Sequence, residues 1–196
     1  QLAFWFNAYN AITVKYILDH HPIKKGGIVF GTLYPANSIR QIKGVWDSLK
    51  TPVAGRELTL DEIEHEVLRA QFSEPRLHVA LVCAARSCPP LRNEPYTADM
   101  LDEQLDDQAR KFLKSQHGLQ IDREHRQIRV STIFDWYGGD FTKTFGSPES
   151  LSDHNEAETA VLHFVARYGG EAAAAYIDEA EYSLRYLDYD WTLNEQ

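Results

Sequence analysis

The sequence predicts an α+β fold, with several helices packed on a small, mostly antiparallel or mixed sheet. Three observations support this class. Segments with helical patterns and short segments with β patterns both occur along the chain. The composition, 43% hydrophobic and 25% charged, is typical of a globular protein. No repeat or low-complexity linker divides the 196 residues. We therefore expect a single compact domain over residues 1–196, with a central buried strand near 76–84.

The first third of the chain predicts two helices. Residues 1–21 are apolar almost all round and lack Gly and Pro, which indicates a buried helix that ends at His20-His21-Pro22. Residues 26–38 predict a loop with one short strand. Residues 59–72 open with Thr59 three positions before Glu62, the pattern of a capping box, and continue as an amphipathic helix.

The middle of the chain predicts a strand, a helix and a hairpin. Residues 76–84 are rich in strand-forming residues and lie between a proline and a turn, which predicts a buried strand. Residues 97–116 predict a second amphipathic helix with Thr97 as its cap. Residues 118–131 contain two short alternating runs around a polar turn, the pattern of a hairpin.

The last third predicts three more helices and a strand. Ser131 is expected to cap a short helix over 132–145. Residues 147–170 predict a helix that ends at a glycine, residues 171–180 a further helix, and residues 182–193 a final strand.

Charge and termini restrict the partners. The chain has 20 Lys and Arg against 29 Asp and Glu, a net charge of −9, and no basic cluster, so nucleic acid is not expected as a partner. No run is long and apolar enough to span a bilayer. The chain begins at Gln1 inside an apolar pattern, so we expect the native N-terminus and any targeting signal to be missing.

Polar residues on the two first helices need an explanation. Asn7 and Asn10 lie one turn apart on an apolar helix, where they either tie the helix to neighbouring backbone or line a site. Asp61, His65 and Arg69 recur every four residues and form either a solvated charge ladder or, if His65 faces a cleft beside Glu64, part of a site.

The stretch "LHVALVCAARSCPPL", residues 77–91, holds both cysteines. In a strand, His78 and Cys83 point to opposite faces and form no simple dyad. Cys83 and Cys88 allow a disulfide or two thiols. Metal-binding spacings and the glycine-rich phosphate or nucleotide motifs are absent, so no metal site is expected and no cofactor can be named.

Five motifs occur in order: "FWFNAYNAITV", "IEHEVLR", "LHVALVCAARSCPPL", "FDWYGGDF" and "YDWTLN". On these motifs the sequence resembles the domain-of-unknown-function (DUF) family 547. This family is found in bacterial proteins and, behind a leucine-zipper or glutaredoxin-like module, in plant and animal proteins. The resemblance implies no reaction. It implies a shared polar set: Asn7, Asn10, Glu64, His65, Arg69, His78, Ser87, Tyr137 and Asp140.

The same resemblance bears on whether the two cysteines are structural or catalytic. Plant members lack both of them, which implies that Cys83 and Cys88 are a local brace rather than a catalytic thiol, and we expect them to be near neighbours that are bonded to each other in an oxidising compartment. Bacterial relatives look secreted or periplasmic, a location that suits a disulfide.

We therefore expect a histidine-centred acid–base enzyme, of the hydrolase or transferase kind, that acts on a small molecule or peptide. The expected catalytic residues are His78, His65 and Glu64, and the expected substrate-binding residues are Arg69, Asn7, Asn10, Ser87, Tyr137 and Asp140. His65, His78 and Arg69 should meet in one pocket. Two alternatives stay open: a non-catalytic protein- or peptide-binding module, and a thiol–disulfide redox domain.

Overall fold

The computed structural model describes residues 1–147, 151, 154–179 and 181–195. Its chain divides into two units, and both contain segments that are distant in sequence. The first unit comprises 1–72, 80–102 and 190–196, and the second comprises 73–79 and 103–189. Helices and two small sheets together confirm the α+β class. The single domain stays a prediction.

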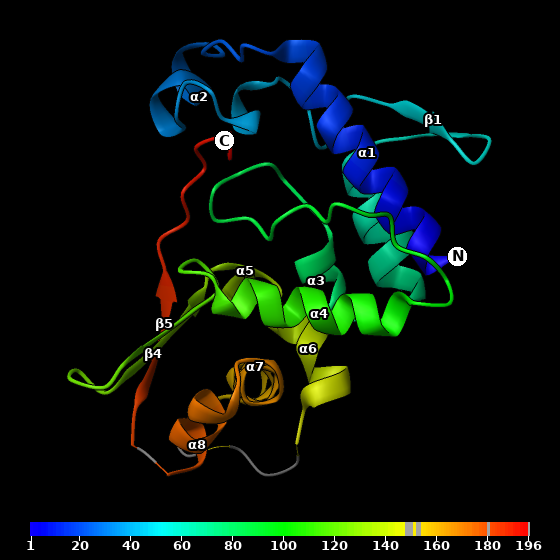
Figure 1. Cartoon of the computed structure of the whole chain (residues 1–196). Helices are drawn as coiled ribbons and strands as arrows, with labels where there is room; N and C mark the ends of the chain where they lie inside the picture. The colour runs from blue at the N-terminus through cyan, green and yellow to red at the C-terminus, as the bar shows by residue number, and fades with distance from the viewer. Residues whose placement is uncertain (148–150, 152–153, 180, 196) are drawn as a thin grey trace. The chain divides into compact units, whose positions relative to one another are not determined.

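The first unit is built on the helix α1 (Leu2–His20), shown in blue in Figure 1. The predicted helix over 1–21 is therefore confirmed. Its buried face includes Phe6, Tyr9 and Ile12, and Asn10 is buried among them. The short helix α2 (Ile28–Leu33) and the 3-10 turn η1 (Ile39–Gln41) follow.

The strand expected within 26–38 is wrong, because α2 occupies that segment. Gly27 adopts a positive φ of 31°, and its carbonyl accepts a hydrogen bond from the Gly31 N–H at 3.1 Å. A glycine takes this conformation without steric penalty, and the resulting turn starts a helix in place of a strand.

A hairpin and a π-helix complete the main elements of the first unit. Strands β1 (Thr51–Val53) and β2 (Arg56–Leu58) pair antiparallel around a turn that the sequence did not predict. The predicted capping box is confirmed, because the Thr59 N–H donates to Glu62 at 2.7 Å and the Glu62 N–H donates to the Thr59 hydroxyl at 3.1 Å. The predicted helix then forms, but as the π-helix η2 (Glu62–Arg69), which lies beside α1.

The predicted central strand over 76–84 is wrong. Residues Leu77–Ala80 form a helical turn, α3, whose first N–H groups donate to carbonyls three residues earlier, among them that of Pro75. Proline is favoured where a helix begins because its φ is already helical. Strand propensity depends on context, and here a short helical turn prevails over it. α3 spans the boundary at which the chain passes from the second unit to the first.

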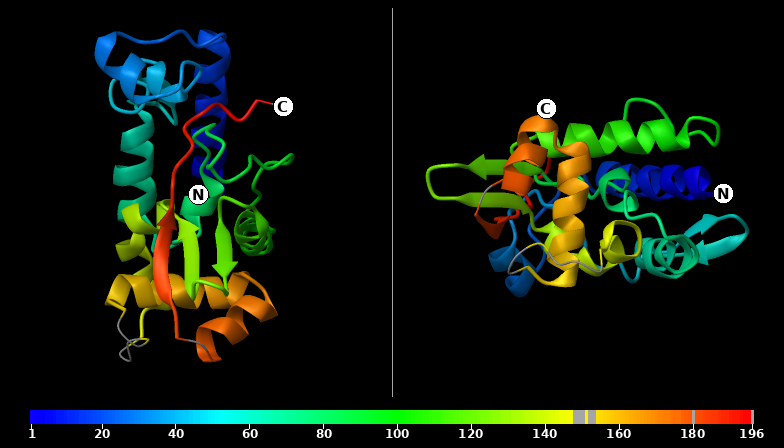
Figure 2. Two further views of the ribbon diagram at one scale, coloured as in Figure 1. Left: turned by 90° about the vertical axis from the view of Figure 1, so that its left-hand side faces the viewer. Right: turned by 90° about the horizontal axis from the view of Figure 1, so that it is seen from below.

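The second unit contains the larger sheet. Strands β3 (Leu119–Asp122) and β4 (Gln127–Ser131) form the predicted hairpin, and β5 (Ser183–Leu187) pairs parallel with β4. The sheet is therefore mixed, and β4 is its central strand (Figure 2). β5 covers only part of the strand expected over 182–193.

After α3, five helices of the described residues lie wholly or mostly in this unit. α4 (Leu101–Lys114) begins four residues after Thr97, its expected cap. The helix expected over 132–145 is two helices, α5 (Ile133–Trp136) and α6 (Gly138–Phe145), and the Ser131 hydroxyl accepts the Ile133 N–H as predicted. α7 (Glu156–Tyr168) and α8 (Glu171–Glu179) follow. Of the helices expected over 147–170 and 171–180, residues 148–150, 152, 153 and 180 lie outside the described residues.

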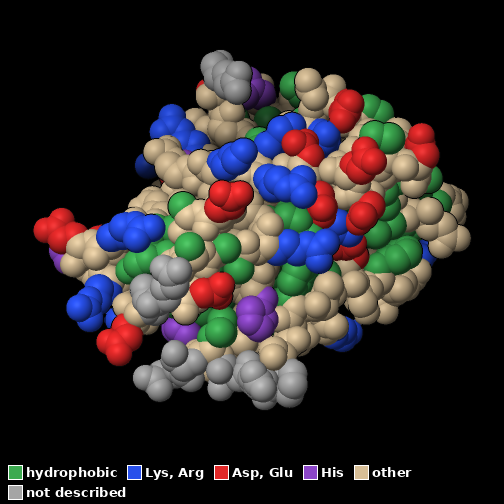
Figure 3. All heavy atoms as spheres, turned by 60° about the horizontal axis from the view of Figure 1, so that its bottom comes forward, with side chains coloured by type: hydrophobic (Ala, Val, Ile, Leu, Met, Phe, Trp, Pro, Cys, Tyr) green, Lys and Arg blue, Asp and Glu red, His purple; other side chains and the backbone are tan. Residues whose placement is uncertain are grey.

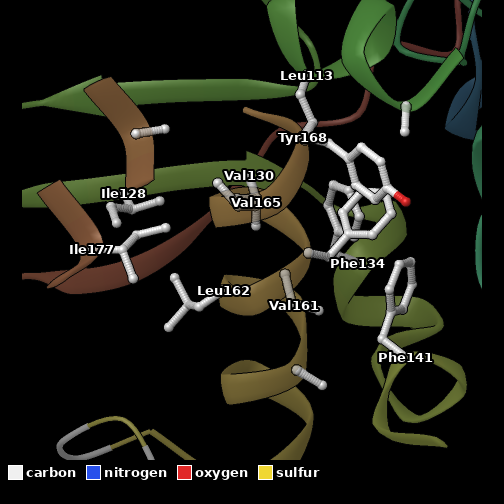
Figure 4. Close-up of a cluster of buried hydrophobic side chains, with 14 of the residues drawn as sticks. Leu113, Ile128, Val130, Phe134, Phe141, Val161, Leu162, Val165, Tyr168 and Ile177 are labelled. Carbon is white, nitrogen blue, oxygen red and sulfur yellow. The ribbon is translucent and has the colours of Figure 1, made fainter. Parts of the chain in front are cut away.

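The core of the second unit is apolar and aromatic (Figure 4). Phe134, Phe141 and Phe164 are fully buried, with ring centroids 5.1–5.6 Å apart. α7 begins with a capping box between Asn155 and Glu158. Outside the core, oppositely charged side chains pair along α4, and on the face seen in Figure 3 Lys and Arg are interspersed with Asp and Glu.

Candidate functional site

The side chains of the two asparagines of α1 form hydrogen bonds with the backbone of other segments of the first unit. Asn10 donates to the Ala80 carbonyl at 2.9 Å and accepts the Val82 N–H at 3.0 Å. Asn7 makes the same pair of bonds with Tyr96, at 2.8 and 2.9 Å. Each side-chain amide therefore donates to one backbone carbonyl and accepts from one backbone N–H. This arrangement satisfies a buried amide. They position the segments around residues 80–82 and 96.

The segment that follows Val82 carries the two cysteines, which are near neighbours as predicted but do not form the predicted disulfide. Neither cysteine is in a disulfide, although the Cys83 N–H donates to the Cys88 sulfur at 2.8 Å. The Cys88 sulfur thus faces the backbone of Cys83. Ala84, between them, has a left-handed φ of 57°. A non-glycine residue in that region is strained, and such strain concentrates at functional sites.

Ser87 braces the same segment. Its hydroxyl accepts the Asp190 N–H at 2.9 Å, and its own N–H donates to the Asp190 carbonyl at 3.3 Å. Two further backbone bonds join Arg86 to Thr192 and Asn194 to Ala84. The segment over 83–88 is therefore fixed by the C-terminal residues of the chain.

A buried tyrosine–glutamate pair lies beside the cysteines. The Tyr9 hydroxyl donates to the Glu64 carboxylate at 3.1 Å, and both side chains are buried. Burial raises the pKa of Tyr9 well above its usual value, and the charges of Glu64 and Cys83 raise it further. Among the described residues, no Lys, Arg or His forms an ion pair with Glu64. Glu64 is thus a buried carboxylate with a hydroxyl as its hydrogen-bond partner.

The predicted stripe along the second helix is confirmed, although that helix is a π-helix. His65 Nδ1 is 3.0 Å from Arg69 Nη1, and His65 Nε2 is 3.9 Å from an Asp61 oxygen. Because arginine only donates, Nδ1 is the acceptor, and a neutral His65 carries its proton on Nε2. The side chains of His65 and Asp61 are 42% and 44% exposed. Short π-helical segments occur frequently at functional sites.

His78 belongs to the second unit, where it contacts two other residues of the predicted set. Its Nε2 is 2.8 Å from an Asp140 carboxylate oxygen, and its ring stacks on Tyr137 with centroids 4.0 Å apart. The imidazole side chain is 2% exposed and Asp140 is 29% exposed. His65 and Arg69 lie in the first unit, so their meeting with His78 in one pocket stays a prediction.

A groove of about 630 Å³ lies along α1 in the first unit. One wall presents Ala11, Val14 and Leu18, and the other is the segment over 91–96. Asn7 and Asn10 also line it. The groove is therefore mostly apolar, although Lys15, Asp19, Arg92 and Glu94 also line it.

Three residues near these groups were not predicted from the sequence: Tyr9, Arg40 and Trp191. Tyr9 lies between the two asparagines in "FWFNAYN", and Trp191 lies in "YDWTLN", so both motifs carried a signal. Nothing in the sequence distinguishes Arg40 from the other arginines. Within the described part of the chain, no group of three or more His, Cys, Asp or Glu could hold a metal ion. No helix of the described residues is long and apolar enough to cross a membrane.

The comparisons with known proteins agree with the first three of the five motifs, which lie within residues 1–113. No curated protein and no solved structure matches the chain. A family model described as protein of unknown function, DUF547, matches residues 1–113, which is more than half of the chain. The chain belongs to the DUF547 family.

Proposed function

We propose that the protein is an acid–base enzyme of the hydrolase or transferase kind, with Glu64 as the group that exchanges a proton with the substrate. The observation that carries this proposal is the buried Glu64 carboxylate, which accepts the Tyr9 hydroxyl and has no ion pair among the described residues. Removing a carboxylate from water without a cation costs several kcal/mol, roughly, even after relaxation. Groups kept in such surroundings cluster at catalytic sites.

The neighbours of Glu64 supply the other parts of such a site. Tyr9 orients the carboxylate, because its high pKa keeps the phenol a hydrogen-bond donor at neutral pH. The next residue, His65, is exposed and offers an Nε2–H when Arg69 occupies Nδ1. A positioned carboxylate and imidazole are the usual groups of general acid–base catalysis.

The proposal gives His78 a positioning role. Its imidazole is almost fully buried and its Nε2 is bonded to Asp140, which is the more exposed partner. A histidine held in this way fixes the carboxylate of Asp140, and the stack on Tyr137 fixes the histidine. Within the second unit, Asp140 is the more exposed member of this group.

The test is turnover of a panel of p-nitrophenyl esters, aryl amides and aryl phosphates, with and without glycerol as an acceptor. Glu64→Gln keeps the shape and removes the proton exchange, so kcat should fall by about 10²–10⁴ with the fold retained. Glu66→Gln is the matched control, because Glu66 is exposed on the same helix. Equal turnover in Glu64→Gln and in the wild type would contradict the proposal.

A second measurement does not depend on the substrate. Glu64→Gln removes an uncompensated buried charge, so its melting temperature at pH 7 should rise. A purely structural Glu64 would give the opposite sign, because the glutamine would weaken the bond with Tyr9.

The groove along α1 favours a second candidate, a non-catalytic module that binds a peptide. A groove of about 630 Å³ with apolar walls and two amides is suited to an apolar peptide segment. Ala11→Trp fills the groove, so it should abolish the enrichment of peptides from a displayed library. Enrichment of the same peptides on Ala11→Trp would contradict this candidate. The thiol–disulfide candidate would instead require that Cys88→Ser abolish reduction of a model disulfide.

A further inference from the structure

Arg40 of the first unit lies against two aromatic rings. Its guanidinium carbon lies 4.3 Å from the ring centroid of Trp191 and 5.2 Å from that of Tyr34. The two rings are themselves edge to face, with centroids 6.0 Å apart. Cations are attracted to aromatic faces at these distances. The guanidinium therefore lies against both rings, and its N–H edge is left for hydrogen bonds.

That edge has no acceptor within the described chain. Arg40 Nε is buried and makes no hydrogen bond, and no carboxylate of the described residues lies within ion-pair distance of the guanidinium. Arginine has five N–H donors and almost always satisfies them when it is buried. An arginine that lies against two rings and lacks an acceptor is an incomplete anion site.

The segments around Arg40 connect it to the proposed site. The Ser38 hydroxyl accepts the Arg40 N–H at 3.2 Å and so fixes the start of η1. Trp191 belongs to the C-terminal segment that hydrogen-bonds to the cysteine segment at Ala84 and Arg86. Burial raises the pKa of Asp61, and the charges of His65 and Arg40 act against that rise. Arg40 is therefore within electrostatic reach of the residue one turn before His65.

We propose that Arg40 binds a carboxylate group of the substrate, an inference that rests on the proposed acid–base function. The planar fork of a guanidinium matches a carboxylate, which can accept from both terminal nitrogens together. Asp61 offsets part of the positive charge, so a singly charged carboxylate fits better than a phosphate dianion. The substrate class is then a carboxylic acid whose ester, amide or related bond is presented to Glu64.

The experiment measures binding of acetate to the whole chain by the indole N–H resonance of Trp191, which Trp191→Phe assigns. Ionic strength is held constant with chloride, inorganic phosphate is the second probe, and methyl acetate is the neutral control. We expect a saturable shift with a Kd for acetate on the order of millimolar, weaker binding of phosphate, and no saturation with methyl acetate.

Substitutions test whether Arg40 is the residue that binds acetate. Arg40→Lys keeps the charge and loses the fork, so the Kd for acetate should rise about tenfold or more. Arg40→Gln should remove saturation, and Arg56→Gln, at an exposed arginine of β2, should leave the Kd unchanged. Should Arg40→Gln unfold, as far-ultraviolet circular dichroism would report, Arg40→Lys alone decides.

Three outcomes overturn the proposal: no saturation in the wild type, the same Kd in Arg40→Lys as in the wild type, or tighter binding of phosphate than of acetate. The proposed function fails separately. If acetate binds as expected but turnover survives in Glu64→Gln, then Arg40 is an anion site and Glu64 is not the acid–base group. If turnover requires Glu64 but acetate does not bind, the inference about Arg40 fails.

Discussion

Both units bury apolar side chains, but the first also buries polar groups that join segments distant in sequence. In the second unit, the rings of Phe134, Phe141 and Phe164 pack against one another at the centre of an apolar cluster. In the first unit, buried Asn10 and Glu64 make hydrogen bonds that join segments distant in sequence. The comparison indicates that packing dominates the stability of the second unit, whereas buried polar groups in the first unit also fix the positions of distant segments. Substitutions in the two units should therefore have different signatures.

The largest effect should come from the aromatic core of the second unit. Phe164→Ala removes a fully buried ring that contacts Phe134, Phe141 and Tyr168, so the free energy of unfolding should fall by about 3–5 kcal/mol. Urea unfolding measures the change. Phe4→Ala is the control, because Phe4 is 50% exposed and should change stability little. A loss below about 1 kcal/mol for Phe164→Ala would contradict a packing-dominated unit.

The next effect should come from the polar ties of the first unit. Asn10→Ala leaves the Ala80 carbonyl and the Val82 N–H without their partner, so the free energy of unfolding should fall by about 1–3 kcal/mol for each group that stays buried and unsatisfied. Hydrogen exchange of the Val82 amide should accelerate in the same variant. Asn93→Ala, at an exposed position, should change neither quantity. An unchanged exchange rate of the Val82 amide would contradict the positioning role of Asn10.

Alkaline pH should distinguish Tyr9 from a tyrosine of the second unit. The folded protein holds the Tyr9 proton above pH 10, where the unfolded chain loses it, so stability must fall as pH rises past 10. Tyr9→Phe should make that decline shallower by up to about 1.4 kcal/mol per pH unit. Tyr168, whose pKa is raised to about 12 by burial and Asp106, should contribute only between pH 10 and about 12. Identical slopes in the wild type and Tyr9→Phe between pH 10 and 11 would refute this assignment.

Local signals predicted much of the fold. The helix over 1–21 followed from its unbroken apolar sequence, and the start of the second helix followed from Thr59 and Glu62. The hairpin over 118–131 followed from its alternation. The strand over 76–84 failed because a helical turn after Pro75 depends on local backbone bonds that composition does not reveal. The segment's apolar residues are buried in either conformation.

The candidate site was predictable only in part, for a similar reason. Spacing alone placed Asp61, His65 and Arg69 on one stripe. The role of Tyr9 depends on a contact with Glu64, and that of Arg40 on Trp191 near the opposite end of the chain. Such pairs have no sequence periodicity. The disulfide prediction failed because sequence spacing permits a bond without orienting the sulfurs, and Cys88 here accepts a backbone N–H.

The smallest effect on stability should come from the exposed stripe of Asp61, His65 and Arg69. A substitution there tests the comparison of the two units most directly. Asp61→Asn removes the carboxylate that lies 3.9 Å from His65, and both side chains are more than two-fifths exposed. Exposed ion pairs contribute about 0–1 kcal/mol, so the free energy of unfolding at pH 7 should change by no more than that. If the stripe serves catalysis, the same variant should alter the pH dependence of turnover, because Asp61 faces the histidine that is proposed to act beside Glu64. Asp19→Asn, at an exposed i,i+4 ion pair of α1, is the control and should alter neither quantity measurably. A large loss of stability with an unchanged pH profile would make the stripe a structural feature, and the first unit would then resemble the second in what its side chains do.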